Sequence, residues 1–265
     1  MENVSYIIPI HVFDENVREN LVNAVKSVAE NSFKEGDRIL LVGPKDVIEK
    51  AEAVCKANAK NYQVQKVENQ NADFFTQVNT AALACVTPYF TILEYDDTLY
   101  PYWNEVMQFY STKSPFLISL NLLVKDGKPY TLANEIALSI AFCDEEEVGV
   151  LKTDVVSKDY VEFNLTGGLF KTEDFISIGG VKTSLKLTSW YEFILRAAYQ
   201  SKPLFVVPKL TYAHTINREG SYMETVGKAI DAAEAEWLIT TARQEYFFKE
   251  DRHKTYQQEK GEDAK

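Results

Sequence analysis

The chain has 265 residues, of which 46% are hydrophobic and 12% aromatic, and its formal net charge is −11. This composition is sufficient for a packed core and argues against an intrinsically disordered chain. The negative charge disfavours a general nucleic-acid coat or an anionic membrane surface as the partner. The length is compatible with one large domain or two small ones.

The three cysteines, Cys55, Cys85 and Cys143, are scattered, and no pair has the spacing of metal ligands. We expect Cys55 and Cys85 to be buried thiols in a reducing compartment. The N-terminus has no basic region followed by a long apolar stretch, and the apolar stretch 116–124 is too short to span a membrane. The sequence therefore predicts a cytoplasmic protein without a membrane span.

The first 93 residues alternate β-prone runs with segments of helical periodicity. Continuous apolar runs predict buried strands, and apolar residues at helical spacing predict helices between them. This alternation is typical of right-handed βαβ units and of a mostly parallel sheet. The expected strands are 4–10, 38–42, 62–67 and 89–93, and the expected helices begin near Asp14, Asp46 and Asp73.

The fourth predicted strand ends in three acidic residues, Glu94, Asp96 and Asp97. Like charges this close repel each other, and a divalent cation with oxygen ligands commonly offsets that repulsion. Ligands of open α/β sheets bind outside the carboxyl ends of the strands, where these acids are placed. The alternative is a solvated turn in which Asp97 caps a helix over 98–110.

The pattern changes in the second half of the chain. Asp126-Gly127 between the β-prone segments 116–124 and 128–132 predicts a hairpin. Gly167-Gly168, within a predicted strand over 164–170, indicates either a bulge or a close approach of the backbone to a ligand. Further elements are expected at 172–179 (helix), 189–200 (helix), 204–207 (strand) and 222–249 (helix), followed by a polar tail.

The order of these features resembles the GT-A glycosyltransferases, specifically the family-2 type that uses nucleotide-diphosphate sugars. The resemblance implies an α/β fold with a mostly parallel nucleotide-binding sheet flanked by helices, a smaller mixed or antiparallel acceptor-side region, and a C-terminal helix. It divides the chain into a nucleotide-sugar-binding half (1–110), an acceptor-side half of the same domain (111–222), and a C-terminal helix and tail (223–265). The segments that carry it are 5–11, 77–82, 93–101, 175–181 and 192–196, with His214 and Ser221.

The resemblance implies an enzyme that transfers a sugar from a nucleotide-diphosphate donor, a UDP-sugar in particular, to an acceptor hydroxyl with inversion. It implies dependence on Mn²⁺ or Mg²⁺, with Asp96, Asp97 and His214 as the metal ligands. A structural role for His214 remains the alternative. Asp46 stands where the family usually has acidic residues near the base. The residues expected to contact the nucleotide donor are Pro9, His11, Asp46, Glu94, Asp96 and Asp97.

The acceptor side departs from the family pattern. The family's catalytic base is an Asp at the start of the acceptor-side helix, and Trp190 stands at that position. Glu192 is the nearest acid, but Ser189 and Glu192 also have the spacing of a capping box. Asp174 and Glu173 are the other acidic candidates, and the Trp190 ring could stack on a sugar or a base.

Two other functions are alternatives to the glycosyltransferase. A catalytically impaired nucleotide-sugar or glycan binding protein on the same fold would need no base. A nucleotidyltransferase would share the strand-end acids, but that class usually carries a Gly-rich, basic loop after the first strand, and segment 11–16 has no glycine and no lysine. The sequence does not identify the acceptor. A glycan and a modified DNA base are the two alternatives, and the acidity of the chain disfavours the DNA base.

Overall fold

The computed structural model describes residues 2–139, 148–151, 162–186 and 188–216, with isolated positions 233, 236, 237 and 240. The strands are β1 Val4–Pro9, β2 Arg38–Gly43, β3 Gln63–Glu68, β4 Tyr89–Ile92, β5 Thr98–Leu99, β6 Phe116–Lys125, β7 Lys128–Ala133, β8 Val150–Leu151, β9 Leu169–Lys171 and β10 Leu204–Thr215. The helices are α1 Glu15–Ala29, α2 Lys45–Asn58, α3 Phe74–Ala84, α4 Trp103–Tyr110, the 3-10 helix η1 Glu135–Leu138, α6 Thr172–Ser177 and α7 Ser189–Tyr199.

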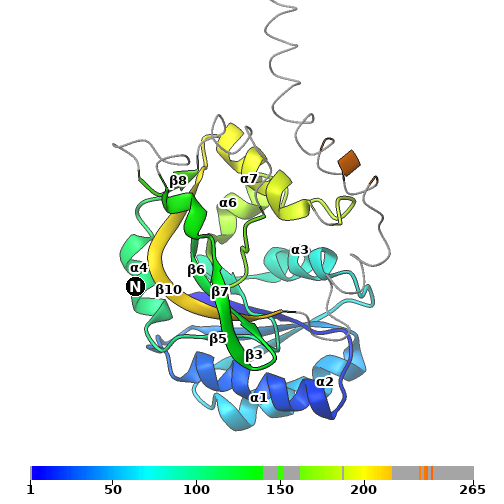
Figure 1. Cartoon of the computed structure of the whole chain (residues 1–265). Helices are drawn as coiled ribbons and strands as arrows, with labels where there is room; N and C mark the ends of the chain where they lie inside the picture. The colour runs from blue at the N-terminus through cyan, green and yellow to red at the C-terminus, as the bar shows by residue number, and fades with distance from the viewer. Residues whose placement is uncertain are drawn as a thin grey trace, which may run out of the picture.

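The described strands form one mixed sheet, in the order β3-β2-β1-β4-β9-β6-β10-β5. Strand β7 pairs with β6, and β8 pairs with β10. Helices α1 and α2 lie on one face of the sheet, and α3, α6 and α7 lie on the other (Figure 1). The expected GT-A-like layering of helices around a sheet is therefore confirmed.

The first four strands pair in parallel, β3 with β2, β2 with β1, and β1 with β4. Helices α1, α2 and α3 connect them, as the alternating pattern predicts. Asp14 and Asp73 cap α1 and α3, because their side chains accept hydrogen bonds from the backbone N–H groups of Val17 and Thr76. The βαβ half of the prediction is confirmed almost residue by residue.

The second half of the sheet places a distant strand end beside β4. Strand β9 is antiparallel to both β4 and β6, and β10 is parallel to β6. Two antiparallel steps restore the original direction, so β10 runs in the same direction as β4. The carboxyl ends of β4 and β10 consequently lie at the same edge of the sheet, and this brings the end of β10 to the acidic turn after β4.

Strand β10 is longer than the sequence predicts. A short strand was expected over 204–207, and Pro208, which cannot donate a hydrogen bond to a neighbouring strand, follows it. The structure continues the strand to Thr215 and shifts its register against β6 between Val207 and Leu210. A proline is tolerated at such an irregularity, and His214 is therefore part of the sheet.

Two expectations about these elements are wrong, and others lie outside the described residues. Residues Thr98–Leu99 form β5 rather than the start of a helix, since α4 begins at Trp103. The strand expected over 164–170 is limited to β9, because Gly167 adopts a φ of +73° in a turn. Helix α6 begins at Thr172, where the expected helix begins, and ends at Ser177. The helix over 222–249 and the division 223–265 lie almost wholly outside the described residues.

Two hydrophobic cores sandwich the sheet. One contains Phe75, Phe90, Phe175 and Phe193 under α3, α6 and α7, and the other contains Tyr6 with side chains of α1, α2 and α4. Burial raises the pKa of the Cys55 thiol to about 12, as expected for an inert core cysteine. Within the described part of the chain, no helix is both long and apolar enough to cross a membrane.

Candidate metal and nucleotide site

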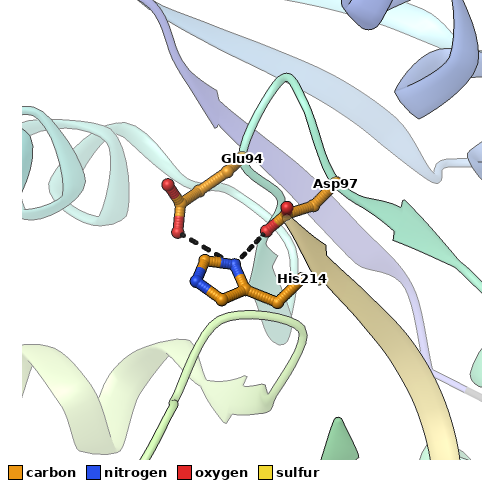
Figure 2. Close-up of side chains that lie close together, drawn as sticks. All are labelled: Glu94, Asp97 and His214. Carbon is orange, nitrogen blue, oxygen red and sulfur yellow. Dashed lines mark hydrogen bonds and ion pairs between the residues drawn. The ribbon is translucent and has the colours of Figure 1, made fainter. Parts of the chain in front are cut away.

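Glu94, Asp97 and His214 meet at the shared edge of β4 and β10. One potential ligand atom from each lies within 4.8 Å of the others (Figure 2). Glu94 and Asp97 come from the turn after β4, and His214 comes from the end of β10. The side chains of Glu94 and His214 are 26% and 22% exposed, whereas Asp97 is fully buried. Two donors of the group are therefore accessible, and the third lies behind them.

Asp97 is held by β10 and does not cap a helix. Its Oδ2 lies 2.7 Å from His214 Nδ1 and accepts a hydrogen bond from the Tyr212 hydroxyl at 2.7 Å. Its Oδ1 accepts a hydrogen bond from the backbone N–H of Thr215 at 2.8 Å. The N-cap of α4 is Tyr102, which makes no side-chain capping bond. The alternative in which Asp97 caps a helix is therefore wrong.

His214 lies in a strongly negative environment. Burial alone would lower its pKa, but the charge and hydrogen bond of Asp97, with the charges of Glu94 and Asp96, outweigh burial and raise the pKa to about 10. His214 Nδ1 is 3.9 Å from the Glu94 carboxylate as well as 2.7 Å from Asp97. The local field thus favours a positive charge at this point.

The donor set suits a divalent cation. Carboxylate oxygens and an imidazole nitrogen are ligands that Mn²⁺ accepts readily. Metal-bound histidines commonly use one ring nitrogen for the metal while a carboxylate holds the other. The contact of Asp97 with Nδ1 leaves Nε2 of His214 available in this way. The residues present therefore fit a divalent ion.

Asp96 stands apart from this group. Its backbone carbonyl accepts a hydrogen bond from the Thr215 hydroxyl at 2.9 Å, and its side chain is half-buried. The three-residue cluster contains Glu94 in the place that the sequence assigned to Asp96. The spacing of acids in the sequence could not distinguish the two, because only the path of the turn decides which carboxylate faces β10.

The other residues expected at the donor lie at the carboxyl ends of β1 and β2. Pro9 is buried at the end of β1 and pairs with Val42, and His11 is exposed just beyond it. Asp46 is exposed in the first turn of α2. A Cβ atom at Gly43 would lie 1.8 Å from the carbonyl oxygen of Ile10, so the two strand ends approach closely only because position 43 is glycine.

Glu192 has a structural partner and is not accessible. Its two carboxylate oxygens accept hydrogen bonds from Nε and Nη2 of Arg196, each at 2.9 Å, and the residue is fully buried. The capping box predicted for Ser189 and Glu192 is wrong, because the Ser189 hydroxyl donates to the carbonyl of Lys182. As placed, Glu192 cannot accept a proton from an acceptor without breaking its pair with Arg196.

Trp190 and Asp174 are also held by neighbouring side chains. The Trp190 ring is half-buried and packs edge-on against Phe75, with 5.3 Å between ring centroids. Asp174 lies between two lysines, 2.7 Å from Lys202 and 3.2 Å from Lys171. Burial opposes the effect of these lysines, but together they lower the pKa of Asp174. A lowered pKa makes Asp174 a weaker base.

Two further residues, which the sequence did not single out for function, fix the Gly179-Gly180 segment. The Asn79 amide donates to the carbonyl of Val181 at 2.7 Å and accepts from its N–H at 2.8 Å. Arg196 donates to the carbonyls of Ile178 and Gly180. The segment is therefore clamped between α3 and α7. Both clamp residues lie within segments that carry the family resemblance, which is the only signal that could have revealed them.

Solved structures with the same fold include glycosyltransferase complexes. The first 349 residues of S. aureus TarS in complex with UDP-GlcNAc match with a TM-score of 0.61 and 15% identity, covering 84% of this chain and 61% of that chain. TarS with UDP matches with a TM-score of 0.58 and 14% identity, covering 92% and 66%. GalNAc-T7 with UDP, GalNAc and Mn²⁺ matches with a TM-score of 0.60 and 15% identity, covering 83% and 45%.

No family model and no curated protein sequence matches the chain. At about 15% identity the structural matches show the fold, which is the GT-A glycosyltransferase fold. The chain spans about three fifths of the length of the TarS fragment. The fold that the sequence resemblance implied is confirmed.

Proposed function

We propose that the protein is a divalent-metal-dependent glycosyltransferase that takes its sugar from a nucleotide diphosphate, UDP in particular. The observation that carries this proposal is the Glu94–Asp97–His214 group at the carboxyl edge of β4 and β10. Negative side chains at this edge of a sheet call for a cation, and a cation at this position can meet a diphosphate. The UDP and Mn²⁺ named with structures of the same fold support the same donor and metal.

Each residue of the group has a distinct proposed role. Glu94 and His214, the accessible members, would hold the ion, and Asp97 would orient the imidazole through Nδ1. When bound, the ion would neutralise charge that develops on the leaving diphosphate. Asp96 is the neighbouring carboxylate for the ion or the ribose, and Pro9, His11 and Asp46 would line the nucleotide side.

A second candidate is a protein that binds a nucleotide sugar without transferring it. The observation that favours this candidate is the state of the three residues expected to be catalytic, Glu192, Asp174 and Trp190. Glu192 is buried against Arg196, Asp174 is paired with two lysines, and Trp190 packs on Phe75.

For the first candidate, the glycosyltransferase, we propose that the sugar is transferred with inversion to an acceptor hydroxyl of a glycan or of a modified DNA base.

Release of UDP from UDP-sugars in the presence of Mn²⁺ distinguishes these candidates. A glycosyltransferase releases UDP as it transfers the sugar to water when no other acceptor is present. Glu94→Gln abolishes this release, while Glu49→Gln, at an exposed acid on α2, leaves it unchanged. UDP-sugar binding without any release supports the binding protein. Failure of every nucleoside diphosphate to bind with Mn²⁺ rejects both candidates. A screen of donors by thermal shift identifies the sugar to use.

A further inference from the structure

Tyr212 contacts the acidic turn at two points, although it is not a member of the Glu94–Asp97–His214 group. The residue lies on β10, two positions before His214, and is fully buried. Its hydroxyl donates to Asp97 Oδ2 at 2.7 Å and accepts a hydrogen bond from the backbone N–H of Glu94 at 3.3 Å. A single oxygen atom therefore links Glu94 and Asp97.

Packing alone does not explain the hydroxyl. A phenylalanine would fill the same space, and burying a hydroxyl costs free energy unless hydrogen bonds offset it. The hydrogen bonds with Asp97 and Glu94 provide that offset.

Gly167 provides the space that the Tyr212 ring occupies. A Cβ atom at position 167 would lie 2.3 Å from Cδ2 of Tyr212, and the residue has a φ of +73°. The backbone of Gly167 is fixed on both sides, since its N–H donates to the carbonyl of Ile92 at 2.8 Å and its carbonyl accepts from Nε1 of Trp103 at 2.6 Å. The backbone of Gly167 therefore hydrogen-bonds to β4 and α4 and packs against the Tyr212 ring.

We propose that Tyr212 is a positioning residue that sets the placement of Glu94 and Asp97 for a divalent cation, and that Gly167 is required because it admits the Tyr212 ring. This inference rests on the metal site of the proposed function. The inference also explains the Gly167-Gly168 pair, because the backbone at Gly167 closely approaches the Tyr212 side chain and not a ligand.

The test is Mn²⁺ binding to the purified full chain, measured by electron paramagnetic resonance of the free ion without nucleotide. Loss of a residue that orients metal ligands typically weakens metal binding about 10-fold to 100-fold, so we expect about a tenfold weaker Kd for Tyr212→Phe. The matched control is Tyr62→Phe, which removes another buried hydroxyl that donates to the carbonyl of Val28. Tyr62→Phe is expected to bind Mn²⁺ as the wild type does.

Gly167→Ala provides a second comparison. Its control is Gly127→Ala, which has a φ of +71° but no atom within 4 Å of the new Cβ. Both variants carry the backbone strain, so a loss of Mn²⁺ binding specific to Gly167→Ala reports the clash with Tyr212. Tyr212→Phe keeps the test valid even if Gly167→Ala does not fold.

The outcomes separate the two proposals. The positioning role is overturned, and the metal site left intact, if the wild type binds Mn²⁺ and the Kd of Tyr212→Phe is within twofold of the wild-type Kd. An equal loss of affinity in Tyr62→Phe overturns the positioning role in the same way. Absence of Mn²⁺ binding by the wild type overturns the metal site and, with it, the role of Tyr212. Weaker binding by Tyr212→Phe alone supports the inference.

Discussion

Asp97 and His214 lie 117 positions apart in the chain, and their Oδ2 and Nδ1 atoms are 2.7 Å apart. This contact joins the turn after β4 to the end of β10. Thr215 and Tyr212 donate to the same carboxylate, so Asp97 is fixed by three groups from one strand. Strand β10 therefore fixes the acidic turn, and the side chains of Glu94 and His214 remain partly exposed to solvent.

Mn²⁺ affinity should rise with pH. The raised pKa of His214, about 10, means that the imidazole is protonated at neutral pH in the metal-free protein. A metal binds the neutral imidazole, so binding releases one proton, and the association constant should increase about tenfold per pH unit below that pKa. Mn²⁺ titrations between pH 6.5 and 8.5 measure this slope. His214→Gln should bind more weakly with a shallower slope, and equal slopes in both proteins would contradict the assignment.

Asp97→Asn should lower the pKa of His214. Burial of the imidazole acts to lower that pKa, and the charge of Asp97 is the leading effect that raises it. Without the charge, the pKa should fall from about 10 towards or below its ordinary value of about 6.5. Proton NMR titration can measure this because the chain has three histidines and His214→Gln assigns the resonance. An unchanged pKa would show that Asp97 does not control His214.

Glu192→Leu should destabilise the fold without a specific effect on the donor site. Removing one partner of a buried ion pair leaves the other charge uncompensated and typically costs about 3–5 kcal/mol. Urea unfolding measures the loss, and Glu173→Leu, at an exposed acid on α6, should change stability by less than about 0.5 kcal/mol. At a temperature where the variant is folded, its UDP affinity should equal that of the wild type. Little loss of stability, but loss of sugar transfer, would restore Glu192 as a catalytic residue.

Asn79→Ala should loosen the Gly179-Gly180 segment. The variant loses two hydrogen bonds to Val181, and unsatisfied backbone groups of this kind cost about 1–3 kcal/mol. Thermal unfolding should show a lower Tm than for Asn16→Ala, an exposed position on α1. Equal melting temperatures would mean that the segment is held without Asn79.

The sequence predicts the donor half of the fold well because that half depends on local patterns. Continuous apolar runs define β1, β2 and β4, and α1 and α3 begin next to Asp14 and Asp73, where the sequence places their starts. The turn after β4 is different, because Asp97 has the local spacing of a cap and is captured by long-range partners on β10. Local propensity could not reveal this.

Contacts across the sheet could not be predicted from the chain order. The sequence prediction ended the strand at residue 207, whereas β10 continues past Pro208 through a register shift against β6. Tyr212 has no motif, and its role appears only when its hydroxyl is seen between Glu94 and Asp97. Glu192 has the spacing of a cap, but a partner one helical turn away, Arg196, determines its actual role.

Calorimetric titration of UDP with and without Mn²⁺ tests the central claim most directly. The claim is that Glu94 and His214, with Asp97 orienting the imidazole, hold an ion that recruits a diphosphate. Wild type and Glu49→Gln should bind UDP in the presence of Mn²⁺, and removal of the metal should weaken binding at least about tenfold. Glu94→Gln should bind as weakly with Mn²⁺ as the wild type does without it. UDP binding of the same strength with and without Mn²⁺, or unchanged by Glu94→Gln, would contradict the claim.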